Sequence, residues 1–194
     1  KQKYTAIVLA AGSGKRMNSQ VHKQYLIIQD RPVLYYSLKA FEDSAVDEIV
    51  LVVGKGEEEF CWKEIVEKYG ISKVKAIVEG GKERYHSVFE GLKQTSDADY
   101  VLIHDGARPF VNQEIIRRCM LEVPEYQACV DGLPVNATIK IADEGGYAKQ
   151  TPDRKNVWMI QTPQTFSYAL FYVAYEEMLK TEDTAITDDA MVLE

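Results

Sequence analysis

The sequence lacks the features that mark membrane, nucleic-acid-binding and secreted proteins. Its apolar runs are short, as at Ile49–Val53, whereas a membrane-spanning helix needs about 20 residues. Lys and Arg number 23 against 30 Asp and Glu, so the net charge is −7, and no long basic stripe favours nucleic-acid binding. We find no secretory signal and expect a cytoplasmic protein, or a stromal one if the source bears plastids.

Cysteine is scarce and poorly spaced for metal binding. The chain has only Cys61, Cys119 and Cys129, an odd number with no C-x-x-C pair. Its three histidines add no zinc-ligand spacing. We therefore expect neither a structural zinc site nor a disulfide framework, but reduced thiols that lie partly in the core.

The 194 residues suffice for about one domain of ordinary size. Short apolar runs rich in β-branched residues recur along the first half, which is typical of buried parallel strands. Between them, apolar residues fall at helical spacing, as at Leu34, Leu38 and Phe41 and at Val88 and Leu92. This alternation predicts an α/β fold with a mostly parallel sheet flanked by helices. The expected strands are Tyr4–Ala10, Glu48–Val53, Val74–Val78 and Tyr100–Ile103.

Beyond residue 128 the pattern changes to short β-like segments. The turn at Gly145-Gly146 separates two of them and predicts a hairpin or arm at about residues 132–160. We expect a single domain over residues 1–194 that carries this excursion. The β-like segments are Ala128–Val130, Thr138–Ala142 and Tyr147–Lys149.

Helical spacing returns near the end of the sequence. It predicts a helix over Ser167–Lys180, and Thr187 is a suitable cap for a last helix over Asp188–Glu194. That last segment has no glycine, proline or basic turn that would end a helix. We therefore expect the chain to be truncated there.

The strongest candidate for a ligand site is Ala10–Met17 (AAGSGKRM), directly after the first expected strand. Gly12 and Gly14 let backbone N–H groups turn toward an anion, and Lys15 and Arg16 add positive charge. In open parallel sheets, ligands bind at such carboxyl ends of strands. The spacing fits neither a Walker A loop nor a dinucleotide fingerprint. A plain strand-to-helix turn is the alternative.

Two further clusters could serve a nucleotide. Lys23 follows the glycine loop and could stabilise developing phosphoryl charge. Gly80 and Gly81 follow the third expected strand and permit close backbone approach to a flat base, while Ser87 could donate a hydrogen bond to it. A solvated lysine and an ordinary turn are the alternatives.

The fourth expected strand is followed by a cluster that contains His104, Asp105 and Arg108. Asp105 could hold Mg²⁺ or a ribose hydroxyl. The alternative is an Asp105–Arg108 pair that only orders the loop, and His104 is more typical of a core histidine than of a ligand. In the arm, Thr138 and Arg154 offer a hydroxyl and a guanidinium suited to a second phosphate.

Taken in order, these segments resemble one family over essentially the whole chain. The motifs that carry the resemblance to the 2-C-methyl-D-erythritol 4-phosphate cytidylyltransferases are AAGSGKRM, KQYL, GGKERYHSV, HDGARPF, Thr138 in PVNATIK, Arg154 and QTPQTF. The resemblance implies a Rossmann-like sheet that binds CTP and Mg²⁺, and a β-arm that clasps a second subunit in a homodimer. It further implies transfer of CMP from CTP to 2-C-methyl-D-erythritol 4-phosphate in the non-mevalonate isoprenoid pathway, with no nucleic-acid or membrane partner.

The resemblance also implies a role for each matching residue. Arg16, Lys23 and Arg154 would be catalytic, and Asp105 would lie near the metal, the ribose and the acceptor. Cytidine would be recognised by Gly80, Gly81 and Ser87. The triphosphate loop would comprise Ala10, Ala11, Gly12, Ser13, Gly14 and Lys15. The acceptor would be bound by Asp105, Arg108, Thr138 and Arg154. The family's later lysine, which grips the acceptor phosphate, is not among these 194 residues.

Two alternatives stay open at this point. Ribitol-5-phosphate cytidylyltransferases share the fold, CTP and mechanism, although Lys23-Gln24-Tyr25 and Gly106-Ala107 favour the methylerythritol enzymes. A non-catalytic nucleotide-binding or assembly protein is the second alternative. Its support is the missing lysine, and Arg16, Lys23 and Asp105 argue against it.

Overall fold

A six-stranded sheet forms the centre of the molecule. The computed structural model describes residues 1–12, 22–181 and 186–194. The strand order is β5-β4-β1-β6-β10-β7, in which the first four strands are parallel and β10 runs antiparallel to both of its neighbours. This confirms the predicted α/β fold with a mostly parallel sheet. The bounds are β1 Tyr4–Ala10, β4 Glu48–Val53, β5 Val74–Glu79, β6 Tyr100–Asp105, β7 Ala128–Pro134 and β10 Trp158–Ser167.

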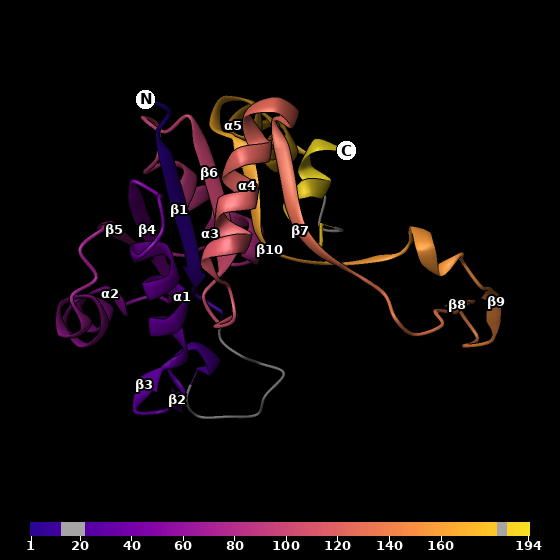
Figure 1. Ribbon diagram of the computed structural model, residues 1–194, viewed down its shortest axis with the longest axis horizontal. Coiled ribbons are helices and arrows are strands. Elements are labelled where there is room, and N and C mark those ends of the chain that lie inside the picture. The colour runs from indigo at the N-terminus through magenta and orange to yellow at the C-terminus, as the bar shows by residue number, and fades with distance from the viewer. Residues whose placement is uncertain (13–21, 182–185) are drawn as a thin grey trace.

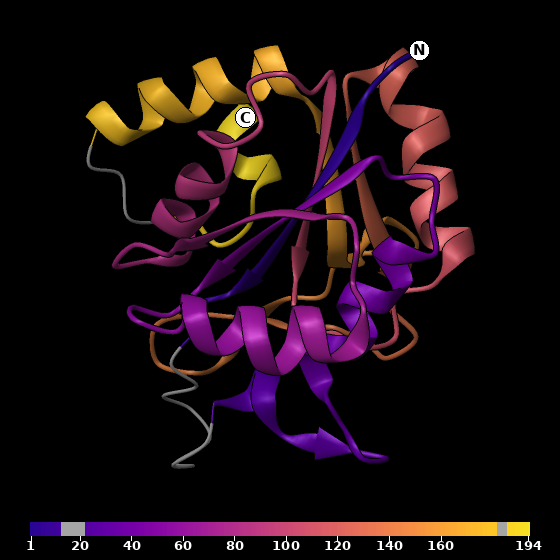
Figure 2. The same cartoon turned by 90° about the vertical axis from the view of Figure 1, so that its left-hand side faces the viewer.

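The sheet is buried on both faces because its central strands are apolar throughout. Successive side chains of β1 alternate between two core clusters, with Ala6 and Val8 in one and Ile7 and Leu9 in the other. The first cluster is covered by α1 (Val33–Glu42), α2 (Glu58–Cys61) with the π-helical turn Trp62–Glu67, and α4 (Gln113–Tyr126). The second is covered by α3 (Arg84–Leu92) and α5 (Tyr168–Lys180). Figure 2 shows α3 and α5 on one side of the sheet and α4 on the other.

The arm leaves the sheet from two neighbouring strands. The chain runs out along β7, forms the hairpin of β8 (Ile141–Ala142) and β9 (Ala148–Gln150), passes through a short turn of helix at Arg154–Asn156, and returns along β10. Figure 1 shows this segment projecting away from the sheet and its helices. At its tip the Asp143 carboxylate accepts hydrogen bonds from the N–H groups of Gly145 and Tyr147, at 3.0 and 2.9 Å.

Four features differ from the sequence-based expectations. The long strand β10 and helix α4 were not predicted, and neither was the short hairpin of β2 (Ile27–Ile28) and β3 (Arg31–Pro32). The expected last helix is wrong: Ala190–Leu193 form only a 3₁₀ turn, which follows Asp189. The N–H and hydroxyl groups of Thr187 contact the sulfur of Met191 instead of capping a helix. The side chain of Gln164 accepts from the N–H groups of Asp189 and Ala190 and so takes the capping role predicted for Thr187.

Other expectations concern the cysteines and the membrane. Cys61 and Cys119 are buried and Cys129 is half-buried, all as free thiols. Among the helices described here, none is both long and apolar enough to cross a membrane.

Candidate active site

The carboxyl ends of β1, β4, β5 and β6 lie at one edge of the sheet, where Ala10–Gly12, Gly80, Gly81 and Asp105 lie. After β1 the structure describes Ala10, Ala11 and Gly12. Ser13, Gly14, Lys15 and Arg16 lie outside the described residues. The buried amide of Gln24 donates to the carbonyl oxygens of Ala10, at 2.6 Å, and of Gly12, at 3.2 Å. Gln24, for which no role was predicted, thus fastens the start of the loop to the segment that carries Lys23.

Lys23 is exposed and lies in a short helical turn, Lys23–Tyr25, that is fixed from both sides. The His22 ring contacts Glu57 at 3.0 Å, and the Tyr25 hydroxyl donates to the same carboxylate at 2.7 Å. Glu57 also accepts from the N–H of Gly54 at the end of β4, at 3.1 Å. These contacts hold the turn against the loop after β4, so the ammonium group of Lys23 extends from a rigid base.

Gly80 and Gly81 form a turn that has no room for side chains. A Cβ at Gly80 would lie 2.5 Å from the Cβ of Ala11, and one at Gly81 would lie 2.3 Å from the Cβ of His86. The loops after β1 and β5 are therefore in contact. The buried hydroxyl of Ser87 accepts from the N–H of Gly81, at 3.1 Å, and donates to the carbonyl of Glu83, at 3.3 Å. In this structure Ser87 shapes the turn.

Asp105 ends β6, and two arginines share its carboxylate. Arg108 donates to Oδ2 at 3.1 Å, which is the pair that the sequence suggested. Arg84, which was not singled out, donates to Oδ1 at 3.1 Å from Nε and lies 3.0 Å away through Nη2. Burial favours the protonated acid, but the two guanidinium groups outweigh it and hold the pKa of Asp105 below its ordinary value.

Behind Asp105, a buried histidine fixes the backbone. The N–H of Asp105 donates to the Thr162 hydroxyl at 3.2 Å, and that hydroxyl contacts Nδ1 of His104 at 2.9 Å. Nε2 of His104 faces the carbonyl of Arg108 at 3.2 Å. Because a carbonyl can only accept, Nε2 carries the proton and Thr162 donates to Nδ1. Burial lowers the pKa of His104 to about 4, so the ring is neutral. His104 is the core histidine that the sequence suggested.

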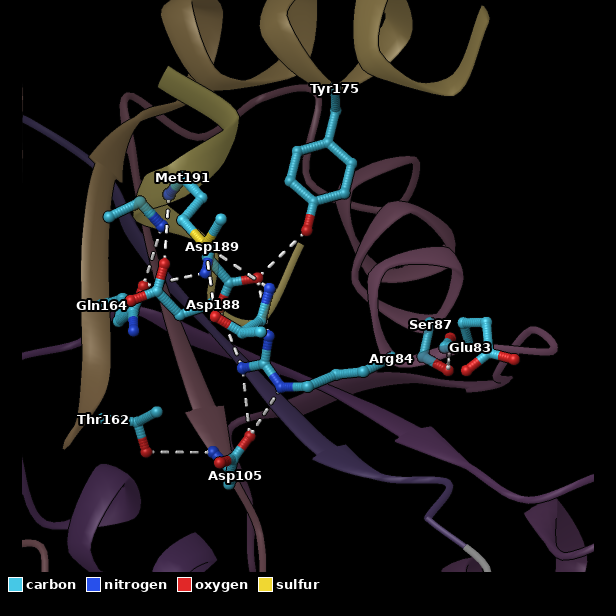
Figure 3. A network of polar contacts seen from close by, with 12 residues as sticks. Glu83, Arg84, Ser87, Asp105, Thr162, Gln164, Tyr175, Asp188, Asp189 and Met191 are labelled. Carbon is cyan, nitrogen blue, oxygen red and sulfur yellow. Dashed lines mark hydrogen bonds and ion pairs between the residues drawn. The ribbon is translucent and has the colours of Figure 1, made fainter. Parts of the chain in front are cut away.

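Asp189 contacts this site, although it lies far from β6 and α3 along the chain. Nη1 and Nη2 of Arg84 each donate to an oxygen of Asp189 at 2.8 Å, and the Tyr175 hydroxyl donates to Asp189 at 3.0 Å. Figure 3 shows Arg84 between Asp105 and Asp189, with Tyr175 reaching down from α5. Sequence reasoning missed this network. The available signal was an acidic pair, Asp188-Asp189, in a segment that was treated only as a helix end.

Two of the predicted residues do not lie at this edge. Thr138 and Arg154 belong to the arm, which projects away from the body in Figure 1. Arg154 is exposed, and its Nη1 donates to the carbonyl of Asn136 at 3.0 Å. Within one chain, the arm residues and Asp105 are therefore held apart.

Taken together, the described part of the edge presents the exposed Lys23, two arginines on the carboxylate of Asp105, and the Gly80-Gly81 turn in contact with Ala11 after β1. Such an arrangement suits a polyanion, because cationic side chains and exposed backbone N–H groups both stabilise phosphate oxygens. Among the described residues of this edge, the hydroxyl that donates to a base, Thr162 on His104, is buried, and no exposed nucleophile is paired with a base. In that part of the chain, no three His, Cys, Asp or Glu residues come together as a metal cage either.

Comparisons with known proteins agree with this chemistry. Two curated relatives, both named 2-C-methyl-D-erythritol 4-phosphate cytidylyltransferase, come from Lachnoclostridium phytofermentans and Lachnospira eligens. The first is 50% identical, covering 100% of this chain and 83% of its own length. The second is 52% identical, covering 98% of this chain and 84% of its own length.

Solved structures show the same fold. The 4-diphosphocytidyl-2C-methyl-D-erythritol synthase from Anaerococcus prevotii matches with a TM-score of 0.86 and 34% identity, over 98% of this chain and 81% of that one. The cytidylyltransferase from Thermus thermophilus matches with a TM-score of 0.75 and 29% identity, over 98% and 83%. A family model described as 2-C-methyl-D-erythritol 4-phosphate cytidylyltransferase matches residues 4–194. The chain belongs to this family, as its motifs indicated.

Proposed function

We propose that this chain transfers CMP from CTP to 2-C-methyl-D-erythritol 4-phosphate at the edge formed by β1, β4, β5 and β6, releasing pyrophosphate. The activity is that of its family and belongs to the non-mevalonate isoprenoid pathway. The observation that carries the location is that Lys23, Asp105 and the Gly80-Gly81 turn lie beside the carboxyl ends of parallel strands. Ligands of open α/β sheets bind at this edge.

The chemistry requires positioning and charge stabilisation rather than a protein nucleophile. The acceptor's phosphate oxygen attacks the α-phosphorus of CTP in line, the bond to the β-phosphate bridging oxygen breaks, and pyrophosphate leaves with that electron pair. Lys23 stabilises the charge that develops on the α-phosphoryl oxygens, and Arg16 does the same from the loop after β1. Gly80 and Gly81 are assigned to the cytosine base, because glycine permits close approach to the backbone.

Mg²⁺ fits this site as a companion of the nucleotide. Magnesium in nucleotide sites is usually bound by one or two carboxylates and by substrate phosphates, so a protein cage is not required. Among the described residues, Oδ2 of Asp105 accepts one hydrogen bond, from Arg108, which leaves a lone pair for a cation. Asp105 would hold the ion, and the ion would offset repulsion among the triphosphate oxygens. Excess EDTA should abolish pyrophosphate release, and undiminished activity would exclude the metal.

The assignment of Lys23 can be tested against a matched lysine. Lys23→Ala should lower kcat by about 100-fold, which is the usual cost of losing one preorganised donor to a transition state. Lys63→Ala is the control, because Lys63 is an exposed lysine on the helical segment after β4 and pairs only with Glu59 among the described residues. Pyrophosphate release from CTP with each polyol phosphate measures both variants. Equal activity of the two variants would remove Lys23 from the catalytic machinery.

We further propose that the arm serves the active site of a second copy in a homodimer. The hairpin β8–β9 is short, and an isolated two-stranded hairpin is only marginally stable in water. The root of the arm exposes Leu133, Trp158 and Met159, each about half exposed. A twofold partner would cover these side chains and bring Thr138 and Arg154 to the acceptor phosphate. Each chain would then hold one catalytic domain and lend its arm to the other.

A subunit-mixing experiment tests this geometry. Arg154→Ala should raise the KM for the acceptor and leave CTP binding unchanged, whereas Lys155→Ala, in the same exposed turn, is the control. Mixing Arg154→Ala chains with Lys23→Ala chains gives mixed dimers with one intact site and one site that carries both changes. Full exchange should restore about a quarter of wild-type activity, since half of the dimers are mixed. A mixture that stays inactive after verified exchange would contradict the arm assignment.

A further inference from the structure

One guanidinium group in this site spans two carboxylates from distant parts of the chain. Arg84 is the first residue of α3. Its Nε and Nη2 face Oδ1 of Asp105 at 3.1 and 3.0 Å, while Nη1 and Nη2 face the two oxygens of Asp189 at 2.8 Å each. Figure 3 shows the side chain lying between the end of β6 and the segment before the 3₁₀ turn. Only a planar fork of five donors can make both contacts at once.

Asp189 is the buried end of this bridge. Its side chain is 1% exposed, against 35% for Arg84 and 31% for Asp105. An ionised carboxylate in such a place is costly unless charged and hydrogen-bonding partners surround it. Arg84 and the Tyr175 hydroxyl supply them. The burial of Asp189 therefore depends on Arg84, and the orientation of Arg84 depends in turn on Asp189.

The backbone at Asp189 and Ala190 is also hydrogen-bonded to the sheet. The side-chain oxygen of Gln164, on β10, accepts from the N–H groups of Asp189 and Ala190, at 3.0 Å each. Asp188 has a different role, because its carboxylate accepts from the N–H of Met191 within the same segment, at 3.1 Å. The segment 186–194 is thus bound to the sheet through Gln164 and to the site through Asp189 and Arg84.

We propose that Arg84 is a positioning residue that couples the docking of residues 186–194 to the orientation of the Asp105 carboxylate. When the segment is docked, Arg84 holds Oδ1 of Asp105, and Oδ2 faces Arg108 and the site. When Asp189 withdraws, Arg84 loses its fixed direction and Asp105 loses one of its two cationic neighbours. The kinetic part of the proposal rests on the proposed function of Asp105, whereas the coupling is a property of the contacts alone.

The kinetic test compares two adjacent aspartates. Asp189→Asn keeps the shape of the side chain and removes its charge, and kcat should fall by about 10- to 100-fold because small displacements of a positioned group have costs of that order. The KM for CTP should stay within about threefold. Asp188→Asn is the matched control and should behave as wild type. Tyr175→Phe, which leaves the ion pair in place, should lower kcat by only a few-fold.

Arg84→Lys tests whether the fork or the charge matters. Lysine keeps the charge but cannot span both carboxylates, so its kcat should fall as far as that of Asp189→Asn. If one coupled unit is broken by either change, the double variant should be no worse than either single variant. If the kcat losses of the two single variants multiply in the double variant, Arg84 and Asp189 act independently, and the coupling is overturned.

A readout free of catalysis completes the experiment. The side-chain Nε–H of Arg84 faces Asp105, so its NMR resonance should exchange slowly with water in the wild type and in Asp188→Asn, and quickly in Asp189→Asn. Persistence of slow exchange in Asp189→Asn would overturn the proposal. If Asp189→Asn does not fold, Tyr175→Phe should show a partial increase in exchange, and its absence would count equally against the proposal. A wild type that releases no pyrophosphate would refute the proposed function, and the Nε–H measurement would still decide the coupling.

Discussion

Charged side chains cluster at both ends of the parallel strands of the central sheet, but in very different surroundings. We call these ends the amino edge and the carboxyl edge. At the amino edge, Lys3 and Lys75 each lie 3.0 Å from Glu48, and both also pair with Asp97. All four of these side chains are partly exposed. At the carboxyl edge the ion pairs have similar lengths, yet one partner, Asp189, is fully buried. The ion pairs are alike in length, whereas the two clusters differ in burial and in the bidentate contact of Arg84 with Asp189.

Hydration explains why an exposed and a buried ion pair differ in energetic weight. An exposed pair gains little, because solvent screens the attraction and ordering the side chains costs entropy. A buried carboxylate has lost its hydration, so its partner becomes indispensable even when the pair as a whole adds little stability. The amino edge can therefore lose a charge at small cost, whereas the carboxyl edge cannot.

The largest effect should come from removing the guanidinium of Arg84. Arg84→Met leaves Asp189 buried without its cation and should lower the free energy of unfolding by about 3 kcal/mol. Lys75→Met removes a cation of the opposite edge and should cost less than about 1 kcal/mol. Urea denaturation at neutral pH measures both. Equal losses would mean that burial does not separate the two clusters.

An intermediate loss in the free energy of unfolding is expected when the hydrogen bonds of Thr162, at the carboxyl edge, are removed. Thr162→Val removes the hydroxyl that joins the N–H of Asp105 to His104, which leaves two buried groups without partners. The expected loss is about 1–3 kcal/mol. Thr162→Ser keeps the hydroxyl and should recover most of it. If the serine variant is as unstable as the valine variant, packing of the methyl group matters more than the hydrogen bonds.

The smallest effect concerns how the ion pairs of the amino edge change the stability of the protein at low pH. Hydrogen bonds from Lys3 and then Lys75 lower the pKa of Asp97 to about 2, from its ordinary value of 3.8. Because the folded pKa is depressed, the stabilisation is present above pH 3.8 and is lost as the pH falls toward 2. Asp97→Asn should flatten thermal stability across this window, with a small loss above pH 3.8, where the ion pairs exist in the wild type, and almost no change near pH 2. A variant curve parallel to that of the wild type would contradict the pairing.

The sequence was sufficient where one local pattern decides the structure. β1 and β4 were predicted with their observed bounds, because strands buried on both faces are uninterrupted apolar runs. The pair Asp105–Arg108 was also accessible, since three positions separate its members. The segment around Thr162 in β10 was not predicted as a strand. Its buried polar residues depend on partners such as His104 and Asp189 that lie far away along the chain.

The site was predicted less completely, for the same reason. Gly80 and Gly81 were predicted to approach a base, which stays a prediction; in the structure their neighbours are Ala11 and His86, which leave no room for a Cβ. The contact between Arg84 and Asp189 joins residues 105 positions apart, and no local spacing indicates such a pair. Nor does a local pattern indicate that Glu57 would hold the turn of Lys23. Supporting residues of this kind become visible only when the chain is folded.

The way in which the arm joins the sheet affects how such an enzyme can evolve. Its two legs continue β7 and β10, which pair with each other in the sheet, so the excursion begins and ends at neighbouring points. Lengthening a closed excursion costs little, because each doubling of a flexible loop adds only about 0.6 kcal/mol of closure entropy. Insertions, deletions and new side chains near Gly146 can therefore be sampled while the sheet stays intact. A lineage could change what the arm recognises and inherit the nucleotide chemistry unaltered.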